Sequence, residues 1–290
     1  MNKLFLIFSL FMAISMQACS NDREQDILDV QYEGQTYEVQ TSELPSNRSG
    51  LNIYGVLYIP KGRSGKIPTV ILSHGLAGTN ASVASYARAL DTQGYACYCF
   101  DFCGGAPSNR SDGKTTEMSI FTEQADLEAV IDNLLTQEFV DENNLFLAGT
   151  SQGGMVSALT AAAHPEKISG LVMLYPALCI ADNMLALYPT LSDVPETFYF
   201  RWLNLGRTYC EGLYDFDTYK AISGYDKNVL IIHGDSDGIV PVSYSQRAAE
   251  AYPNAKLEII SGAGHGFYGD DFARASESIL NYIAEHLKKN

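Results

Sequence analysis

The chain has 290 residues, of which 46% are hydrophobic and 18% charged, so its composition is that of a globular protein with a buried core. Lysine and arginine total 19 against 34 aspartate and glutamate, which gives a formal net charge of -15. Such an excess of negative charge repels phosphate backbones, which argues against a nucleic-acid partner. The length allows one large domain, with or without an insertion.

The N-terminal stretch has the layout of an export signal. Lys3 supplies a positive charge, and residues 4–14 form an almost unbroken apolar run that is too short for an ordinary membrane span. Ala18 directly before Cys19 resembles the lipobox of bacterial lipoproteins, in which the cysteine is lipidated and becomes the new N-terminus. We therefore predict that residues 1–19, including Cys19, are a lipoprotein-type signal peptide.

Two further regions follow from this boundary. Residues 20–26 are predicted to be a polar tether, and residues 27–290 the folded domain. The chain is then expected to be exported and held at the cell envelope by its lipid anchor alone, facing either the periplasm or the surface. Cleavage without lipidation would instead give a secreted protein.

The spacing of apolar residues changes along the folded region. Alternation within residues 27–60 predicts antiparallel strands. Beyond them, short apolar strands are predicted at 69–72, 95–100, 145–148, 171–175, 229–232 and 257–260. Helices are predicted at 82–93, 122–137, 155–163 and 276–287. Strands that alternate with helices in this way predict an α/β fold, with a mostly parallel central sheet and helices on both faces.

Residues 176–226 break this alternation. The segment is long, rich in tyrosine and phenylalanine, and without a regular period. Long segments of this kind inside a compact domain are usually functional. We therefore predict a cap inserted after a core strand.

The cysteines do not indicate a metal site. Cys97 and Cys99 lie two residues apart in a predicted strand, so both would face the same side as small buried residues. Their C-x-C spacing differs from the common zinc patterns. No metal or organic cofactor is predicted.

Residues 149–153 read Gly-Thr-Ser-Gln-Gly, a G-x-S-x-G pentapeptide. An apolar strand runs directly into this sequence and a helical pattern follows it. That context predicts a tight strand-to-helix turn that presents Ser151 above the sheet as a nucleophile. The flanking glycines suit a strained turn in which larger side chains would collide.

A serine hydroxyl needs a base, and the base needs an acid that fixes its tautomer. His265 is the best candidate base among the five histidines, because it lies in a glycine-rich loop just after a late strand. Asp235 and Asp237 both follow an earlier strand, and we prefer Asp237 as the acid. Asp235 is then a turn residue. The chain order Ser151, Asp237, His265 is the order expected for this kind of fold.

Two backbone amides are predicted to stabilise the oxyanion of the reaction. One belongs to Gln152, the residue after the nucleophile. The other is assigned to Leu76, in the glycine-rich loop after the first parallel strand. His74 in the same loop is expected to be structural.

Four motifs together resemble the α/β-hydrolase superfamily. They are H-G-x-x-G at 74–78, G-x-S-x-G at 149–153, H-G-x-x-D-x-x-V-P at 233–241 and G-A-G-H-G-F at 262–267. Within the superfamily, the sequence around Ser151 (residues 149–154) and the 176–226 insertion resemble those of the bacterial cinnamoyl (feruloyl) esterases. This resemblance implies a cap that binds an aromatic acyl group, with Tyr209 and Asp182 as candidate substrate contacts.

The expected activity is hydrolysis of carboxylic esters through an acyl-enzyme, on feruloyl, cinnamoyl or other small acyl esters, free or linked to polysaccharide. A short-chain lipase and a serine peptidase are the alternatives within the same chemistry. A non-catalytic surface lipoprotein that binds a ligand is the alternative of another class.

Overall fold

The computed structural model describes residues 37–288, except residues 49 and 64, so the predicted signal peptide and tether lie outside the described residues. The strands are β1 (Tyr37–Pro45), β2 (Asn52–Pro60), β3 (Ile67–Ser73), β4 (Ala96–Phe100), β5 (Val140–Thr150), β6 (Gly170–Leu174), β7 (Thr197–Phe200), β8 (Leu203–Gly206), β9 (Val229–Gly234) and β10 (Ala255–Ile260). The helices are α2 (Asn80–Asp91), α3 (Ile120–Leu134), α4 (Gln152–Ala163), α5 (Ile180–Leu187), α6 (Thr218–Ile222), α7 (Ser243–Ala251) and α8 (Gly269–His286).

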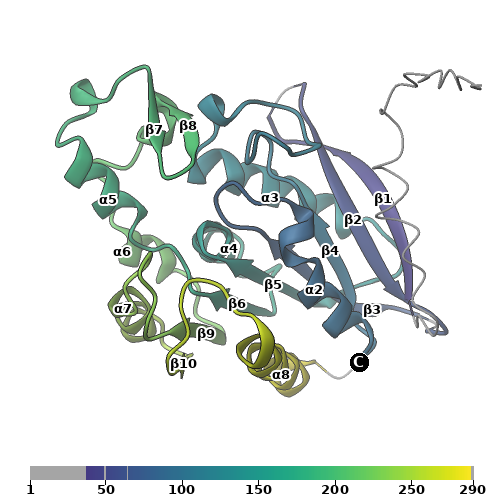
Figure 1. Ribbon diagram of the computed structural model, residues 1–290. Helices are drawn as coiled ribbons and strands as arrows, with labels where there is room; N and C mark the ends of the chain where they lie inside the picture. Colours follow the sequence, from purple (N-terminus) through teal and green to yellow (C-terminus); the bar gives the residue numbers. More distant parts are fainter. Residues whose placement is uncertain (1–36, 49, 64, 289–290) are drawn as a thin grey trace, which may run out of the picture. The chain divides into compact units, whose positions relative to one another are not determined.

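Eight of these strands form one sheet, in the order β1-β2-β4-β3-β5-β6-β9-β10 (Figure 1). β2 is antiparallel to both β1 and β4, and the pairs from β4 to β10 are parallel. The predicted α/β class with a mostly parallel central sheet is confirmed. Within the described part of the chain, no helix combines the length and hydrophobicity that a membrane crossing requires.

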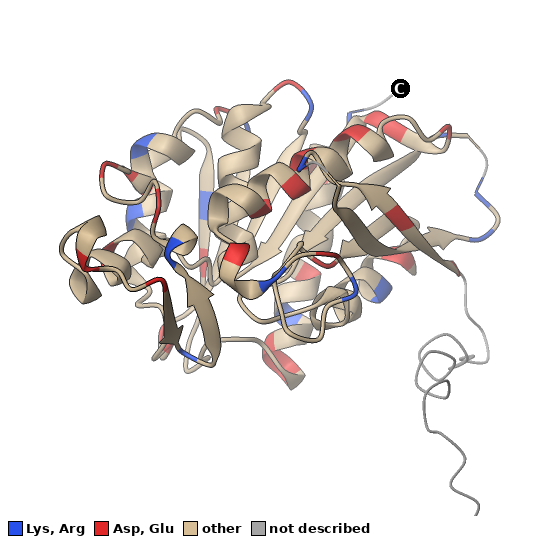
Figure 2. Ribbon diagram, turned by 90° about the horizontal axis from the view of Figure 1, so that it is seen from above, with Lys and Arg blue, Asp and Glu red and all other residues tan. Residues whose placement is uncertain are grey.

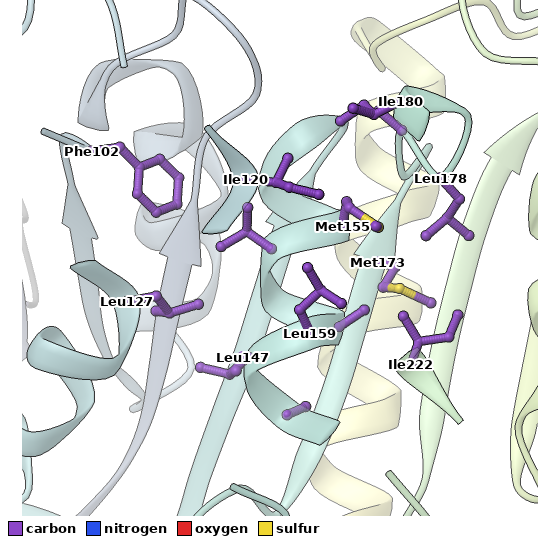
Figure 3. Close-up of a cluster of buried hydrophobic side chains, with 14 of the residues drawn as sticks. Phe102, Ile120, Leu127, Leu147, Met155, Leu159, Met173, Leu178, Ile180 and Ile222 are labelled. Carbon is purple, nitrogen blue, oxygen red and sulfur yellow. The ribbon is translucent and has the colours of Figure 1, made fainter. Parts of the chain in front are cut away.

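Hydrophobic side chains pack on both faces of the sheet. One buried cluster includes residues of α2 and α8, and the other includes residues of α3, α4, α6 and α7. Figure 3 shows the second cluster, in which Leu127 of α3 and Leu159 of α4 lie near Leu147 of β5. The strand β4 contributes to both clusters, because Cys97 and Cys99 face one side and its two aromatic residues face the other. Both cysteines are free buried thiols.

The predicted core strands and helices are all present, with ends that differ by several residues. The largest shift is in α8, which begins at Gly269 instead of residue 276, because its first turn carries Asp270 and Asp271 and has no apolar period. The helix α7 was not predicted. Apart from Tyr244, the apolar residues of α7 are alanines, which give only a weak apolar pattern in the sequence.

The segment between β6 and β9 is more regular than its sequence suggests. It holds α5, the antiparallel hairpin β7–β8, two short 3₁₀ helices (Leu191–Asp193 and Arg207–Tyr209) and α6. Figure 1 shows α5 and the hairpin beyond the edge of the main sheet. The Thr115 hydroxyl donates a 2.7 Å hydrogen bond to the Asn204 carbonyl, which ties the hairpin to the loop before α3. The two-residue turn Arg201–Trp202 joins the hairpin strands. We refer to residues 176–226 as the cap.

Candidate active site

Ser151 stands at the turn between β5 and α4, with a backbone φ of 51°. Positive φ is costly for any residue with a side chain, so the packing around the turn must enforce it. Glycines allow the close contacts that do so. A Cβ on Gly149 would collide with the Gly153 carbonyl, and one on Gly153 would collide with the carbonyls of Ser73 and His74. The turn around Ser151 therefore packs tightly against the end of β3.

His265 bridges Ser151 and Asp237. Its Nε2 lies 2.9 Å from the Ser151 Oγ, and its Nδ1 lies 2.7 Å from the Asp237 Oδ2. With an ionised aspartate, Nδ1–H donates to the carboxylate, and Nε2 is left to accept the serine proton. The edge of the Tyr175 ring contacts the imidazole, with 4.9 Å between the ring centroids. The structure thus brings together the three residues that the sequence assigned to one reaction.

The Asp237 side chain is completely buried. Burial alone would raise its pKa, but hydrogen bonds from the amides of Val240 and Ile239 and from His265 outweigh that effect and lower the pKa. The two amides lie 2.9 and 2.8 Å from Oδ1. The aspartate therefore stays ionised beside the imidazole. The other candidate, Asp235, instead accepts a 2.6 Å hydrogen bond from the Gly262 amide at an exposed turn.

His233 also contacts Asp237, a contact that the sequence did not predict. Its Nε2 lies 3.1 Å from Oδ2, the oxygen that His265 also approaches. The Ser245 hydroxyl lies 2.7 Å from the His233 Nδ1. Burial lowers the pKa of His233, so the ring is neutral near pH 7. With Nδ1 accepting from Ser245, Nε2 carries the proton and donates to the Asp237 carboxylate and to the Val240 carbonyl, which lies 3.0 Å away. The position of His233 at the end of β9, four residues before Asp237, was the available clue.

The predicted oxyanion donors lie on either side of the serine. Leu76 and Gln152 both line the cavity above Ser151. Among the described residues, neither backbone amide has a hydrogen-bond partner. Gly75 allows the loop to approach, because a Cβ there would lie 3.0 Å from the Ser151 Cβ. His74 behind it is buried and accepts a hydrogen bond from the Phe102 amide, as a structural residue of the loop would.

The Gln152 side chain is held at both ends. Its Oε1 accepts a 2.7 Å hydrogen bond from the Tyr209 hydroxyl in the cap. Its Nε2 donates a 2.8 Å hydrogen bond to Oε2 of Glu123 in α3. All three residues are buried. Burial raises the pKa of Glu123 to about 8, against the opposing effect of the Gln152 hydrogen bond. Glu123 and Tyr209 lie 29 and 57 residues from Gln152 in the sequence, so no local sequence pattern links either of them to it.

A cavity of about 140 Å³ opens over the serine. Its lining residues are Gly75, Leu76, Ser151, Gln152, Ala177, Cys179, Ile180, Asn183, Phe200, Arg201, Trp202, Tyr209, Ile239, Val240 and His265. Most of this lining is apolar, and much of it comes from the cap. Tyr209 is among these residues, although its hydroxyl already binds Gln152. Asp182 is not among them, and its carboxylate accepts a 2.8 Å hydrogen bond from the Tyr244 hydroxyl.

The remaining described histidines and a second groove lie apart from the cavity above Ser151. His164 lies near Glu128, and the His286 Nδ1 contacts the Tyr282 carbonyl. Within residues 37–288, no group of three or more histidine, cysteine, aspartate or glutamate side chains is arranged to hold a metal ion. A second groove of about 350 Å³, along β10 and α8, shares no lining residue with the cavity above Ser151.

Comparisons with known proteins agree with this fold. A family model described as serine aminopeptidase, S33, matches residues 66–211, and one described as alpha/beta hydrolase fold matches residues 201–272. The first covers half of the chain, and the chain belongs to this family of α/β-hydrolases. Its fold and family support an enzyme of the hydrolase class.

Individual relatives are distant in sequence. An uncharacterized protein of Mycobacterium tuberculosis (strain ATCC 25618 / H37Rv) is 29% identical over 78% of this chain and 74% of its own. The alpha/beta hydrolase domain-containing protein 17C of Xenopus tropicalis is 26% identical over 76% of this chain and 62% of its own. Among solved structures, Est1E from Butyrivibrio proteoclasticus with bound ferulic acid has a TM-score of 0.77 and 26% identity, covering 86% of this chain and 100% of that one.

Proposed function

We propose that the chain is a serine carboxylic-ester hydrolase that acts through an acyl-enzyme. The observation that carries the proposal is the hydrogen-bonded series from Ser151 through His265 to the buried, ionised Asp237. Each contact lies in the range that proton transfer from serine requires. The positive φ of Ser151 supports the same reading, because strained backbone is characteristic of functional sites.

The reaction follows from the positions of these groups. The Ser151 Oγ attacks the ester carbonyl while His265 Nε2 takes its proton, and the imidazolium then gives that proton to the departing alcohol. Water next attacks the acyl-enzyme with His265 again as base, which releases the acid and restores Ser151. Asp237 holds the tautomer and stabilises the transient imidazolium. The unpaired amides of Leu76 and Gln152 supply the donors for the oxyanion.

The substrate class proposed is an ester with a feruloyl, cinnamoyl or other small acyl group. The apolar cavity and the similarity to Est1E with ferulic acid support it. Tyr209 would contact the acyl group with its ring, since its hydroxyl is bound to Gln152. The proposed contact of Asp182 rests on the family resemblance alone, because its carboxylate binds Tyr244. A short-chain lipase or a peptidase would use the same serine.

Export and lipidation at Cys19 remain a proposal that rests on the N-terminal sequence. A lipid-anchored esterase at the cell envelope would act on extracellular esters, including those carried by polysaccharides.

Hydrolysis of methyl ferulate beside 4-nitrophenyl acetate, butyrate and octanoate tests the proposal. Ser151→Ala should lower every serine-dependent rate by at least about 10³-fold, and a fluorophosphonate probe should label the wild type but not Ser151→Ala. Ser192→Ala, at an exposed cap serine, is the matched control. Activity on aliphatic esters alone would retain the serine mechanism and overturn the aromatic acyl group. Absence of labelling and of ester turnover would favour the non-catalytic alternative.

A further inference from the structure

The charge of the cavity differs from that of the chain. Aspartate and glutamate outnumber lysine and arginine by 34 to 19, and the acidic residues are spread over many elements of the ribbon in Figure 2. The cavity lining reverses this balance, since it contains Arg201 and no aspartate or glutamate. Asp237 lies behind His265 with its side chain completely buried. Within the described part of the chain, Arg201 is therefore the one lysine, arginine, aspartate or glutamate that lines the space above Ser151.

Arg201 occupies the tip of the β7–β8 hairpin in a strained conformation. Its φ of 57° lies in the left-handed region, which a long side chain adopts only at a cost. Its Nη2 reaches toward the Ile239 carbonyl, at 3.5 Å, on the opposite wall of the cavity. The guanidinium also lies 5.8 Å from the centre of the Phe200 ring. The side chain thus extends from the cap to the loop that follows Asp237.

The guanidinium has no carboxylate partner. Among the described residues, no aspartate or glutamate oxygen lies within the 4.0 Å of an ion pair with Arg201. The single bond to Ile239 is long and occupies one of five N–H donors. The remaining donors form a fork that matches the two oxygens of a carboxylate.

From this arrangement we propose that Arg201 is a specificity-determining residue that binds an anionic group, such as a carboxylate, on the ester substrate. The proposal rests on the proposed esterase function and names its substrate class more closely. The anion would sit at the cavity mouth, away from Ser151, in either the acyl or the alcohol part of the ester. A charge-assisted bond from Arg201 would hold the ester while the serine attacks.

Two pairs of substrates test this assignment on the purified protein. Mono-4-nitrophenyl adipate against 4-nitrophenyl hexanoate places the charge in the acyl part. 4-Acetoxybenzoate against methyl 4-acetoxybenzoate places it in the alcohol part. The measured quantity is the ratio of kcat/KM for the charged ester to kcat/KM for its neutral partner. Arg201→Gln should lower this ratio roughly tenfold in at least one pair, and Arg201→Lys should lower it less.

The control is Arg207→Gln, a change of the same charge in the same cap at a residue outside the cavity lining. It should leave both ratios within about twofold of wild type, and added salt should weaken the wild-type preference. Equal ratios in Arg201→Gln and wild type for both pairs would overturn the role of Arg201. Continued serine-dependent hydrolysis of the neutral esters in that case would leave the esterase proposal intact. If the wild-type protein hydrolyses none of these esters, the esterase proposal itself is overturned.

Discussion

The phenol of Tyr209 donates a 2.7 Å hydrogen bond to the side-chain carbonyl of Gln152, the residue that follows the proposed nucleophile. Tyr209 comes from the cap and Gln152 from the first turn of α4. Each is 1% exposed, so water cannot take the place of either partner. This bond joins the wall of the cavity above Ser151 to the residue whose amide we propose as an oxyanion donor.

Tyr209→Phe should therefore act mainly on stability and on kcat. The change leaves the Gln152 Oε1 buried without a donor, which costs about 1–3 kcal/mol of the free energy of unfolding. Urea unfolding measures that loss. Tyr199→Phe, at a cap tyrosine that is 73% exposed, is the control and should change little. A Tyr209→Phe protein as stable as wild type would show that the bond contributes nothing net.

His233 should act on the reaction through Asp237. His233→Leu removes the donor at Nε2, and we expect kcat/KM for 4-nitrophenyl butyrate to fall about tenfold, since hydrogen bonds to charged groups contribute about 1.5–3 kcal/mol. His233→Gln can place an amide N–H near the same oxygen and should recover most of the loss. A folded Leu variant with the wild-type kcat/KM and pH profile would contradict this role.

The burial of Asp91, which lies away from the cavity, predicts that the stability of the protein depends on pH. Asp91 is 1% exposed, and neither of its carboxyl oxygens has a hydrogen-bond partner among the residues that the structure describes. Burial raises its pKa from 3.8 to about 7. Between these values the unfolded chain loses the proton while the folded chain keeps it, so stability falls as the pH rises. Asp91→Asn should abolish that fall and stabilise the protein by up to about 4 kcal/mol at pH 8, with little effect at pH 4.

Chemical unfolding at both pH values measures the effect of Asp91→Asn. Asp215→Asn, at an exposed aspartate of the cap, is the matched control. An equal difference between variant and wild type at pH 4 and pH 8 would show that folding does not raise the pKa of Asp91.

The N-terminal proposal makes a separate prediction. Labelled palmitate fed to a bacterial host should enter the full chain, and Cys19→Ser should abolish incorporation. Cys99→Ser, at a buried thiol of β4, should leave labelling unchanged. Equal labelling of wild type and Cys19→Ser would place any lipid elsewhere.

Local sequence patterns predicted the body of the fold well. Buried strands such as β6 and β9 are mostly apolar runs, and the turn after β5 carries its own glycine pattern. The contacts of Ser151, His265 and Asp237 were also anticipated, because each residue lies in a recognisable loop at the end of a strand. Such loops meet at one edge of a parallel sheet.

The internal structure of the cap and the buried polar contacts were not predictable in the same way. The strands β7 and β8 have four residues each, and alternation over four residues is too brief to separate a strand from a loop. Glu123 and His233 were missed because their importance comes from partners brought close by the tertiary fold. Nothing in the neighbouring sequence distinguishes Glu123 from other acidic residues on a helix.

The tight backbone contacts of Gly153 against Ser73 and His74 have a consequence for how this protein could acquire new substrates. They join the nucleophile turn and the oxyanion loop into one body that tolerates almost no added atoms. The hairpin that carries Phe200, Arg201 and Trp202 instead makes its hydrogen bonds to Thr115 and Ile239, outside that body. Exchange of this hairpin between homologues should thus transfer substrate preference while the chemistry at Ser151 stays the same.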